Sequence, residues 1–132
     1  MKNNKKARIL VVDDEISIRE SLKDFLEDNG YVVDAAGTAE EALVFISKAE
    51  YDLSVIDLRL PRMNGETLIK RAHQLKPAMR FIIHTGSVDY VLSKELMAIG
   101  MTREDVFFKP VANMMLIVNA IERIVGGQPA LS

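Results

Sequence analysis

Short apolar runs rich in β-branched residues alternate along this chain with longer segments of helical spacing, and this alternation constrains the fold more than any other feature. The runs at Ile9–Val12 and Leu53–Ile56 are nearly continuous in apolar residues, as strands buried on both faces of a sheet should be. The alternation predicts an α/β protein with helices on both faces of a mostly parallel sheet. The expected strands are Arg8–Val12, Tyr31–Ala35, Leu53–Ile56, Arg80–Ile83 and Val106–Phe108.

The segments between these runs place apolar residues at the intervals of an amphipathic helix, and glycine, proline and capping residues mark their ends. Five helices are therefore expected, one after each strand. In chain order, the first helix is expected to end at Asn29-Gly30, the second to begin at the capping box Thr38–Glu41, and the third to end before Pro77. The fourth is expected to run from about Val88 to Ile99, and the fifth to end at Gly126-Gly127.

Composition narrows the class of protein. A chain of 132 residues fits one domain, and a net charge of −2 gives no basic field that would indicate binding to nucleic acid or to an anionic membrane. With no cysteine, neither a disulfide framework nor a thiolate metal site is expected. No apolar run approaches the ~18 residues of a membrane span, and the basic start Met1–Lys6 lacks the apolar core of a signal peptide. We therefore expect a cytoplasmic protein.

Polar side chains stand where four of the expected strands end. Asp13 and Asp14 follow the first strand, Asp57 follows the third, Thr85 the fourth and Lys109 the fifth. Functional sites of parallel sheets form at the carboxyl ends of the strands. Three carboxylates, one hydroxyl and one ammonium are therefore expected to converge on one edge of the sheet.

These groups suit phosphoryl chemistry with a hard cation. Closely packed carboxylates raise one another's pKa unless a cation lies among them. An all-oxygen ligand set favours Mg²⁺, with Mn²⁺ as an alternative. A carboxylate beside such an ion can attack phosphorus and form an acyl phosphate. The metal, Lys109 and Thr85 could then neutralise the phosphoryl oxygens.

Five short motifs stand at or just after the ends of the expected strands, namely Val11-Val-Asp-Asp-Glu15, Val55-Ile-Asp57-Leu, Pro61-Arg-Met-Asn-Gly65, Ile83-His-Thr-Gly86 and Phe108-Lys-Pro110. In order and spacing they resemble the receiver domains of two-component response regulators, over about Arg8 to Val125. The resemblance implies a CheY-like, doubly wound, five-stranded parallel sheet with five helices in the flavodoxin-like order 2-1-3-4-5. It also implies a receiver domain at 8–125, with an N-terminal extension at 1–7 and a tail or start of a linker at 126–132.

The resemblance also implies a role for each acidic residue. Asp57 would be the phosphoacceptor, modified by a sensor histidine kinase or a phosphotransfer protein, and would be a metal ligand as well. Asp14 would bind Mg²⁺ directly and Asp13 through water, while the main-chain carbonyl of Arg59 completes the protein ligands.

For the switch, the resemblance implies that Thr85 hydrogen-bonds the phosphoryl group and moves toward it, while Lys109 pairs with a phosphoryl oxygen. Pro110 would follow a cis peptide bond. The movement would change the surface of helix 4, strand 5 and helix 5, which would act on a downstream effector domain or protein or form a homodimer. No direct contact with nucleic acid or membrane is expected of this domain.

Two further residues are expected to tune the site. The side chain of Arg59 would overhang the phosphoryl site, pair with Asp13 or Glu15 before phosphorylation, and change the lifetime of the acyl phosphate, with Ser87 as its neighbour. His84 should point to the opposite side of the sheet from Thr85, because side chains alternate along a strand.

The chain departs from the family pattern in two places. About two more residues separate Gly100 from Lys109 than in most members, so Met101–Asp105 is expected to form an extra helical turn capped by Thr102. Val106 occupies a position where the family often has tyrosine or phenylalanine. Because a β-branched side chain is stiff, we expect backbone movement near this site rather than rotation of a ring.

Two other functions remain open from the residues alone. An aspartate-nucleophile phosphohydrolase of the haloacid-dehalogenase type needs a second aspartate two residues after Asp57, where this chain has Arg59. A pseudo-receiver would bind partners without phosphorylation, but such proteins usually lose an acid or the lysine. The expected protein is a signalling module with slow self-catalysed phosphoryl chemistry and no metabolic substrate.

Overall fold

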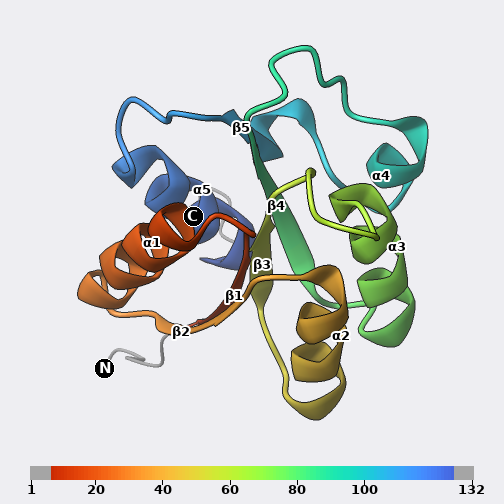
Figure 1. Cartoon of the computed structure of the whole chain (residues 1–132), viewed down its shortest axis with the longest axis horizontal. Coiled ribbons are helices and arrows are strands. Elements are labelled where there is room, and N and C mark those ends of the chain that lie inside the picture. Colours follow the sequence, from red (N-terminus) through yellow and green to blue (C-terminus); the bar gives the residue numbers. More distant parts are fainter. Residues whose placement is uncertain (1–6, 127–132) are drawn as a thin grey trace.

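The computed structural model describes residues 7–126 and contains a five-stranded parallel sheet in the order β2-β1-β3-β4-β5 (Figure 1). This confirms the predicted fold class and strand order. The predicted extension at 1–7 and tail at 126–132 lie almost entirely outside the described residues. The strands are β1 Arg8–Val12, β2 Val32–Ala36, β3 Leu53–Ile56, β4 Arg80–Thr85 and β5 Val106–Phe108.

Helices cover both faces of the sheet, α1 and α5 on one and α2, α3 and α4 on the other (Figure 1). No helix among residues 7–126 is long and apolar enough to cross a membrane. The helices are α1 Ile16–Asp28, α2 Ala39–Lys48, α3 Gly65–Leu75, α4 Lys94–Ala98 and α5 Met115–Gly126, with a short 3-10 helix, η1, at Arg103–Asp105.

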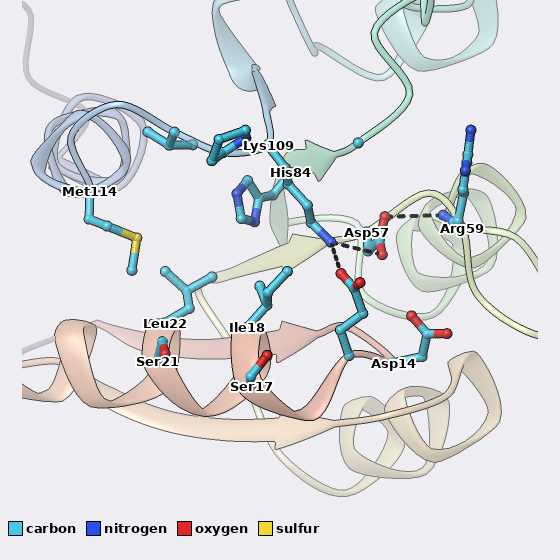
Figure 2. A pocket seen from close by; sticks show the side chains of 14 residues that line it. Asp14, Ser17, Ile18, Ser21, Leu22, Asp57, Arg59, His84, Lys109 and Met114 are labelled. Atoms are coloured by element: carbon cyan, nitrogen blue, oxygen red, sulfur yellow. Dashed lines mark hydrogen bonds and ion pairs between the residues drawn. The ribbon is translucent and has the colours of Figure 1, made fainter.

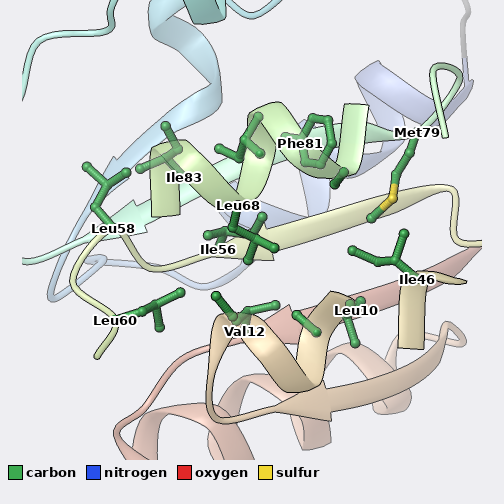
Figure 3. Packing of buried hydrophobic residues seen from close by; sticks show 14 of the residues in the cluster. Leu10, Val12, Ile46, Ile56, Leu58, Leu60, Leu68, Met79, Phe81 and Ile83 are labelled. Carbon is green, nitrogen blue, oxygen red and sulfur yellow. The ribbon is translucent and has the colours of Figure 1, made fainter. Parts of the chain in front are cut away.

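Alternation along the strands divides the core into two layers. Leu10 and Val12 of β1 pack beneath α2 and α3, whereas Ile9 and Val11 pack beneath α1 and α5. The first layer is shown in Figure 3, where side chains of β1, β3 and β4 meet those of α2 and α3. In β4, Ile83 belongs to this layer and Ile82 to the other. The same period places His84 on the α1 and α5 face and Thr85 on the opposite face.

Several predicted helix limits are confirmed. The Thr38 side chain accepts a hydrogen bond from the backbone N–H of Glu41, which opens α2 as a cap. Gly30 ends α1 with a φ of 95°. The expected extra turn is η1, where Thr102 and Asp105 form a capping box.

The fourth helix is much shorter than predicted. The spacing indicated a helix from Val88 to Ile99, but α4 covers only Lys94–Ala98, and Ser93 caps it by accepting from the N–H of Leu96. Val88 and Val91 are 72% and 77% exposed, so these two residues of the expected apolar stripe do not pack against the core. Residues 87–93 therefore form a non-helical segment, which is called the β4–α4 segment below.

Two strands differ slightly from prediction. β2 begins at Val32 rather than Tyr31, because the N–H of Tyr31 bonds to the carbonyl of Leu26 at the end of α1. β4 continues to Thr85 rather than ending at Ile83, because β5 pairs with its last residues.

Candidate functional site

Backbone pairing at the carboxyl edge of the sheet brings the predicted residues together. The N–H of Asp57 bonds to the carbonyl of Val12 at 2.9 Å, and the N–H of Lys109 bonds to the carbonyl of Thr85 at 2.8 Å. These bonds continue the parallel ladders past the last residue of each strand. Figure 2 shows the resulting site, with Lys109 and Asp57 directed toward each other above the ends of the strands.

The three predicted acids form one cluster. Asp13, Asp14 and Asp57 each offer a carboxylate oxygen, and these oxygens all lie within 4.8 Å of one another. Asp13 and Asp57 are buried and Asp14 is exposed. An all-oxygen set with one solvent-facing member fits a hard cation such as Mg²⁺, whose other positions are filled by water or phosphate.

Burial is the main reason that the pKa of Asp57 lies above its ordinary value, and the neighbouring Asp13 carboxylate contributes to the rise. The N–H of Arg59, 3.2 Å from Asp57 Oδ1, and the Lys109 ammonium act in the opposite direction. The charged form of Asp57 is therefore disfavoured on balance, which a bound cation would reverse.

Lys109 is held by three carboxylates. Its Nζ atom lies 2.9 Å from Asp13 Oδ2, 3.0 Å from Glu15 Oε1 and 3.2 Å from Asp57 Oδ2. Burial alone would lower the pKa of Lys109, but the hydrogen bonds with Asp13 and Glu15 and the charges of Asp13 and Asp57 outweigh it and raise the pKa. The contact with Glu15 was not predicted, and its only signal in the sequence is a third acid directly after the acidic pair.

The chain turns sharply behind Asp57 because of one glycine. Gly65 begins α3, and its N–H bonds to the carbonyl of Leu58 at 2.9 Å. A Cβ atom at this position would lie 2.6 Å from the carbonyl oxygen of Asp57 and 2.8 Å from the Cα of Leu58. Only glycine permits this close approach, which sets the backbone that carries the Asp57 carboxylate.

The Arg59 side chain does not make the expected ion pair. Its Nε atom donates to Ser87 Oγ at 2.9 Å, and it forms no salt bridge with Asp13 or Glu15 in the part of the chain that the structure describes. The expectation was wrong because Lys109 already occupies both carboxylates. Arg59 instead links the loop after β3 to the β4–α4 segment.

Thr85, Val106 and Pro110 lie at the positions expected for the switch. Thr85 is fully buried, and its Oγ1 accepts from the N–H of Ser87 at 3.0 Å. Val106 pairs with Ile83 across the sheet and packs against the α2, α3 and α4 layer. The Lys109–Pro110 peptide bond is cis.

A cavity of about 760 Å³ extends from the acidic cluster between α1 and the segment after β5. Its walls include Asp57 and Lys109 at one end and Leu22 and Met114 at the other (Figure 2). His84 lines this cavity, on the side of the sheet predicted for it, and is only 5% exposed. Burial, with the nearby Lys109 charge, lowers the pKa of His84 below its ordinary value.

A sequence model of the family described as "Response regulator receiver domain" matches residues 9–122. The two-component response regulator PhoP of Pseudomonas aeruginosa is 38% identical over 103 residues, which are 78% of this chain and 45% of PhoP. FixJ of Rhizobium meliloti is 35% identical over 113 residues, 86% of this chain and 54% of FixJ. The chain thus spans about half the length of these curated relatives.

Solved structures of response regulators are also similar to this chain. A CheY-like receiver domain from Methanospirillum hungatei is 33% identical with a TM-score of 0.78, over 93% of this chain and 96% of that one. TrrA from Thermotoga maritima is 29% identical with a TM-score of 0.77, over 89% of this chain and 98% of that one. The TrrA structure is a complex with Mg²⁺–BeF.

Proposed function

This chain belongs to the response regulator receiver domain family of two-component systems, and from that premise we propose that it is a switch controlled by phosphorylation of Asp57. The observation that supports this most strongly is the convergence of Asp57 with Asp13, Asp14 and Lys109 on one edge of the sheet. We assign the receiver domain to residues 8–125.

The acidic cluster would hold Mg²⁺ through Asp13, Asp14 and Asp57, with the Arg59 carbonyl as a further ligand and Mn²⁺ as a substitute. The cation supplies positive charge that favours ionised Asp57 and neutralises phosphoryl oxygens. One carboxylate oxygen of Asp57 attacks phosphorus, the bond between phosphorus and the leaving group of the donor breaks, and an acyl phosphate results.

Lys109 would stabilise the transferred group. Its ammonium already lies 3.2 Å from Asp57 Oδ2, so a phosphoryl oxygen on Asp57 can take over that contact. Thr85 can donate its hydroxyl proton to another oxygen while its Oγ1 still accepts from the N–H of Ser87. Because of this bond, a shift of Thr85 toward the phosphoryl group would draw the β4–α4 segment with it.

We propose that this movement changes the surface formed by α4, β5 and α5. Exposed apolar side chains on all three elements, namely Met97, Phe108 and Leu116, suit a contact with another protein surface. The partners would be a histidine kinase or phosphotransfer protein as donor, and a downstream effector domain or protein, or a second copy of this chain, as the recipient of the change. We propose a cytoplasmic location for this exchange.

The chain would also catalyse the slow hydrolysis of its own acyl phosphate. It would have no metabolic substrate. The Arg59 side chain, fixed to Ser87, hangs beside the site and would hinder the attacking water. Arg59→Ala should therefore change the dephosphorylation rate, measured on the phosphorylated protein in excess Mg²⁺. Equal rates would mean that Arg59 is only a surface arginine.

The test of the phosphoacceptor is direct. Incubation with Mg²⁺ and acetyl phosphate should add the mass of one phosphoryl group, and Asp57→Asn should abolish this gain. Asp52→Asn, at the opposite end of β3, is the matched control and should be modified normally. Stoichiometric modification of the Asp57→Asn protein would refute the assignment of Asp57 as the phosphoacceptor.

Neither alternative function is favoured. The position at which a phosphohydrolase has its second aspartate holds Arg59, whose side chain bonds to Ser87. A pseudo-receiver is disfavoured because the complete acidic cluster and Lys109 are present and in contact.

A further inference from the structure

The Lys109 ammonium has a carboxylate partner for each of its three N–H donors. Its Nζ atom lies within 3.2 Å of carboxylate oxygens of Asp13, Glu15 and Asp57. Asp13 and Asp57 belong to the acidic cluster that fits a cation, and Glu15 does not. Of these three partners, Glu15 is therefore the one whose carboxylate keeps its full charge for Lys109 when a cation is bound.

Glu15 does not serve as the cap of α1, although it occupies the N-cap position. Its side chain makes no capping hydrogen bond, and the side chains favoured at this position are those of aspartate, asparagine, serine and threonine. The Oε1 atom instead contacts Lys109, which lies 94 residues further along the chain. The backbone N–H of Glu15 donates to Asp13 Oδ1 at 2.9 Å, which fixes this residue beside the acidic cluster. The position of Glu15 thus serves the contact with Lys109 rather than the start of the helix.

A bound cation would loosen the other two contacts of Lys109. The oxygens of Asp13 and Asp57 would then be shared with a second positive charge, which also repels the ammonium. The contact with Asp57 Oδ2 changes again when a phosphoryl group is attached to that residue. Glu15 takes part in neither event, and its Oε1 atom lies 3.0 Å from Nζ.

We propose that Glu15 is a positioning residue for phosphoryl transfer, which holds the Lys109 ammonium beside Asp57 while a cation occupies the acidic cluster. This inference rests on the proposed function of Asp57. In this role Glu15 contacts neither the cation nor phosphorus and acts only through Lys109. Its side chain is 57% exposed, and exposed ion pairs contribute modestly, so a modest effect on the rate is expected.

The rate of Asp57 modification by acetyl phosphate tests the proposal when it is measured in saturating Mg²⁺, which removes any effect of a lost charge on cation affinity. Glu15→Ala should slow the reaction by roughly two- to fivefold, as the loss of an exposed ion pair implies. Glu15→Gln keeps a side-chain oxygen that can accept from Lys109 and should be slowed less. Glu20→Ala removes an exposed acid of α1 and is the matched control, with no expected change. An unchanged or higher rate in Glu15→Ala would overturn the proposal.

The mobility of the Lys109 side chain separates this role from a general effect on folding. NMR relaxation of its Cε methylene group is measured for wild type, Glu15→Ala and Glu20→Ala, with Mg²⁺ and with a chelator. In the chelator Asp13 and Asp57 still hold Lys109, so both variants should resemble wild type. In Mg²⁺ the Lys109 side chain should become more mobile in Glu15→Ala alone. Equal mobility of Lys109 in wild type and Glu15→Ala with Mg²⁺ present would also overturn the proposal.

Loss of modification in the wild-type protein would have a different meaning. It would refute the role of Asp57 as the phosphoacceptor. A normal wild-type rate combined with an unaffected Glu15→Ala protein would refute only the role of Glu15.

Discussion

The charge of Asp57 destabilises the metal-free protein, which leads to a prediction about pH. Its folded pKa is raised, so the native state binds a proton more readily than the unfolded chain, and stability falls as pH rises through this range. Without metal, Asp57→Asn should raise the melting temperature at neutral pH. The gain should fade as pH falls through the raised pKa toward the ordinary value near 3.8, where Asp57 becomes neutral by itself.

Thermal unfolding of both proteins at several pH values, in the presence of a chelator, checks this prediction. Asp52→Asn, an exposed acid at the other end of β3, should show no comparable gain. A melting temperature for Asp57→Asn that is lower than that of wild type at neutral pH would contradict the account.

Gly65 provides the second test at the level of a single residue. In Gly65→Ala the new methyl group meets backbone atoms of Asp57 and Leu58 within 2.8 Å, and neither can move without shifting the loop. We expect the free energy of unfolding to fall by about 1–3 kcal/mol, measured by urea denaturation. Gly86→Ala, whose Cβ would meet nothing within 4 Å, should cost much less. Equal losses would show that the close approach does not constrain the turn.

Single residues differ in how far their positions could be predicted. Asp57 and Lys109 could be placed because the carboxyl ends of parallel strands meet on one edge, whatever the side chains do. Ser87 was expected beside Arg59, but the direct hydrogen bond between them could not be predicted, because a long flexible side chain can bond to any of several partners that only the folded structure brings within reach. The same holds for the contact of Glu15 with Lys109.

At the scale of elements, the main error in prediction concerns the β4–α4 segment. Val88, Val91 and Leu92 have helical spacing, but only Leu92 is buried. The segment is instead held by a tertiary contact, since the hydroxyl of Tyr90 donates to Glu66 Oε2 on α3 at 2.5 Å. The spacing of apolar residues contains no information about such a tertiary bond. The segment is therefore not helical, although its sequence pattern favours a helix.

The same bond predicts how the switch can be biased. If phosphorylation draws Thr85 and the β4–α4 segment toward Asp57, the bond between Tyr90 and Glu66 opposes that movement. Tyr90→Phe should therefore bind beryllium fluoride more tightly, by up to about tenfold, and its amides at 87–93 should exchange faster in the free protein. Affinity can be measured by titration with Mg²⁺ present.

A second tyrosine offers the matched control. Tyr51→Phe removes a hydrogen bond of the same length, 2.5 Å, to Asp34 at the opposite edge of the sheet. It should leave the affinity for beryllium fluoride unchanged. Weaker binding by Tyr90→Phe would show that the bond supports the activated form rather than opposing it.

For the whole molecule, one strand end connects two faces of the sheet. His84 and Thr85 are neighbours in β4, but alternation directs His84 into the cavity between α1 and the segment after β5, and Thr85 toward the layer of α2, α3 and α4. The cavity beside Asp57 thus lies on the opposite face of the sheet from Thr85, the residue that would start the structural change. This division could be predicted from the sequence, because it depends only on the alternation of side chains along one strand.

The central claim, that a group on Asp57 changes a distant surface, is tested most directly by amide chemical-shift maps with and without beryllium fluoride in excess Mg²⁺. A two-state switch responds only to the difference in the interactions that the group makes with the two states. The account predicts shifts that extend from Asp57 through the β4–α4 segment to Met101–Asp105 and Val106, and none in Asp57→Asn. Shifts confined to the loops that carry Asp13, Asp14 and Asp57, with residues 87–106 unchanged, would contradict it.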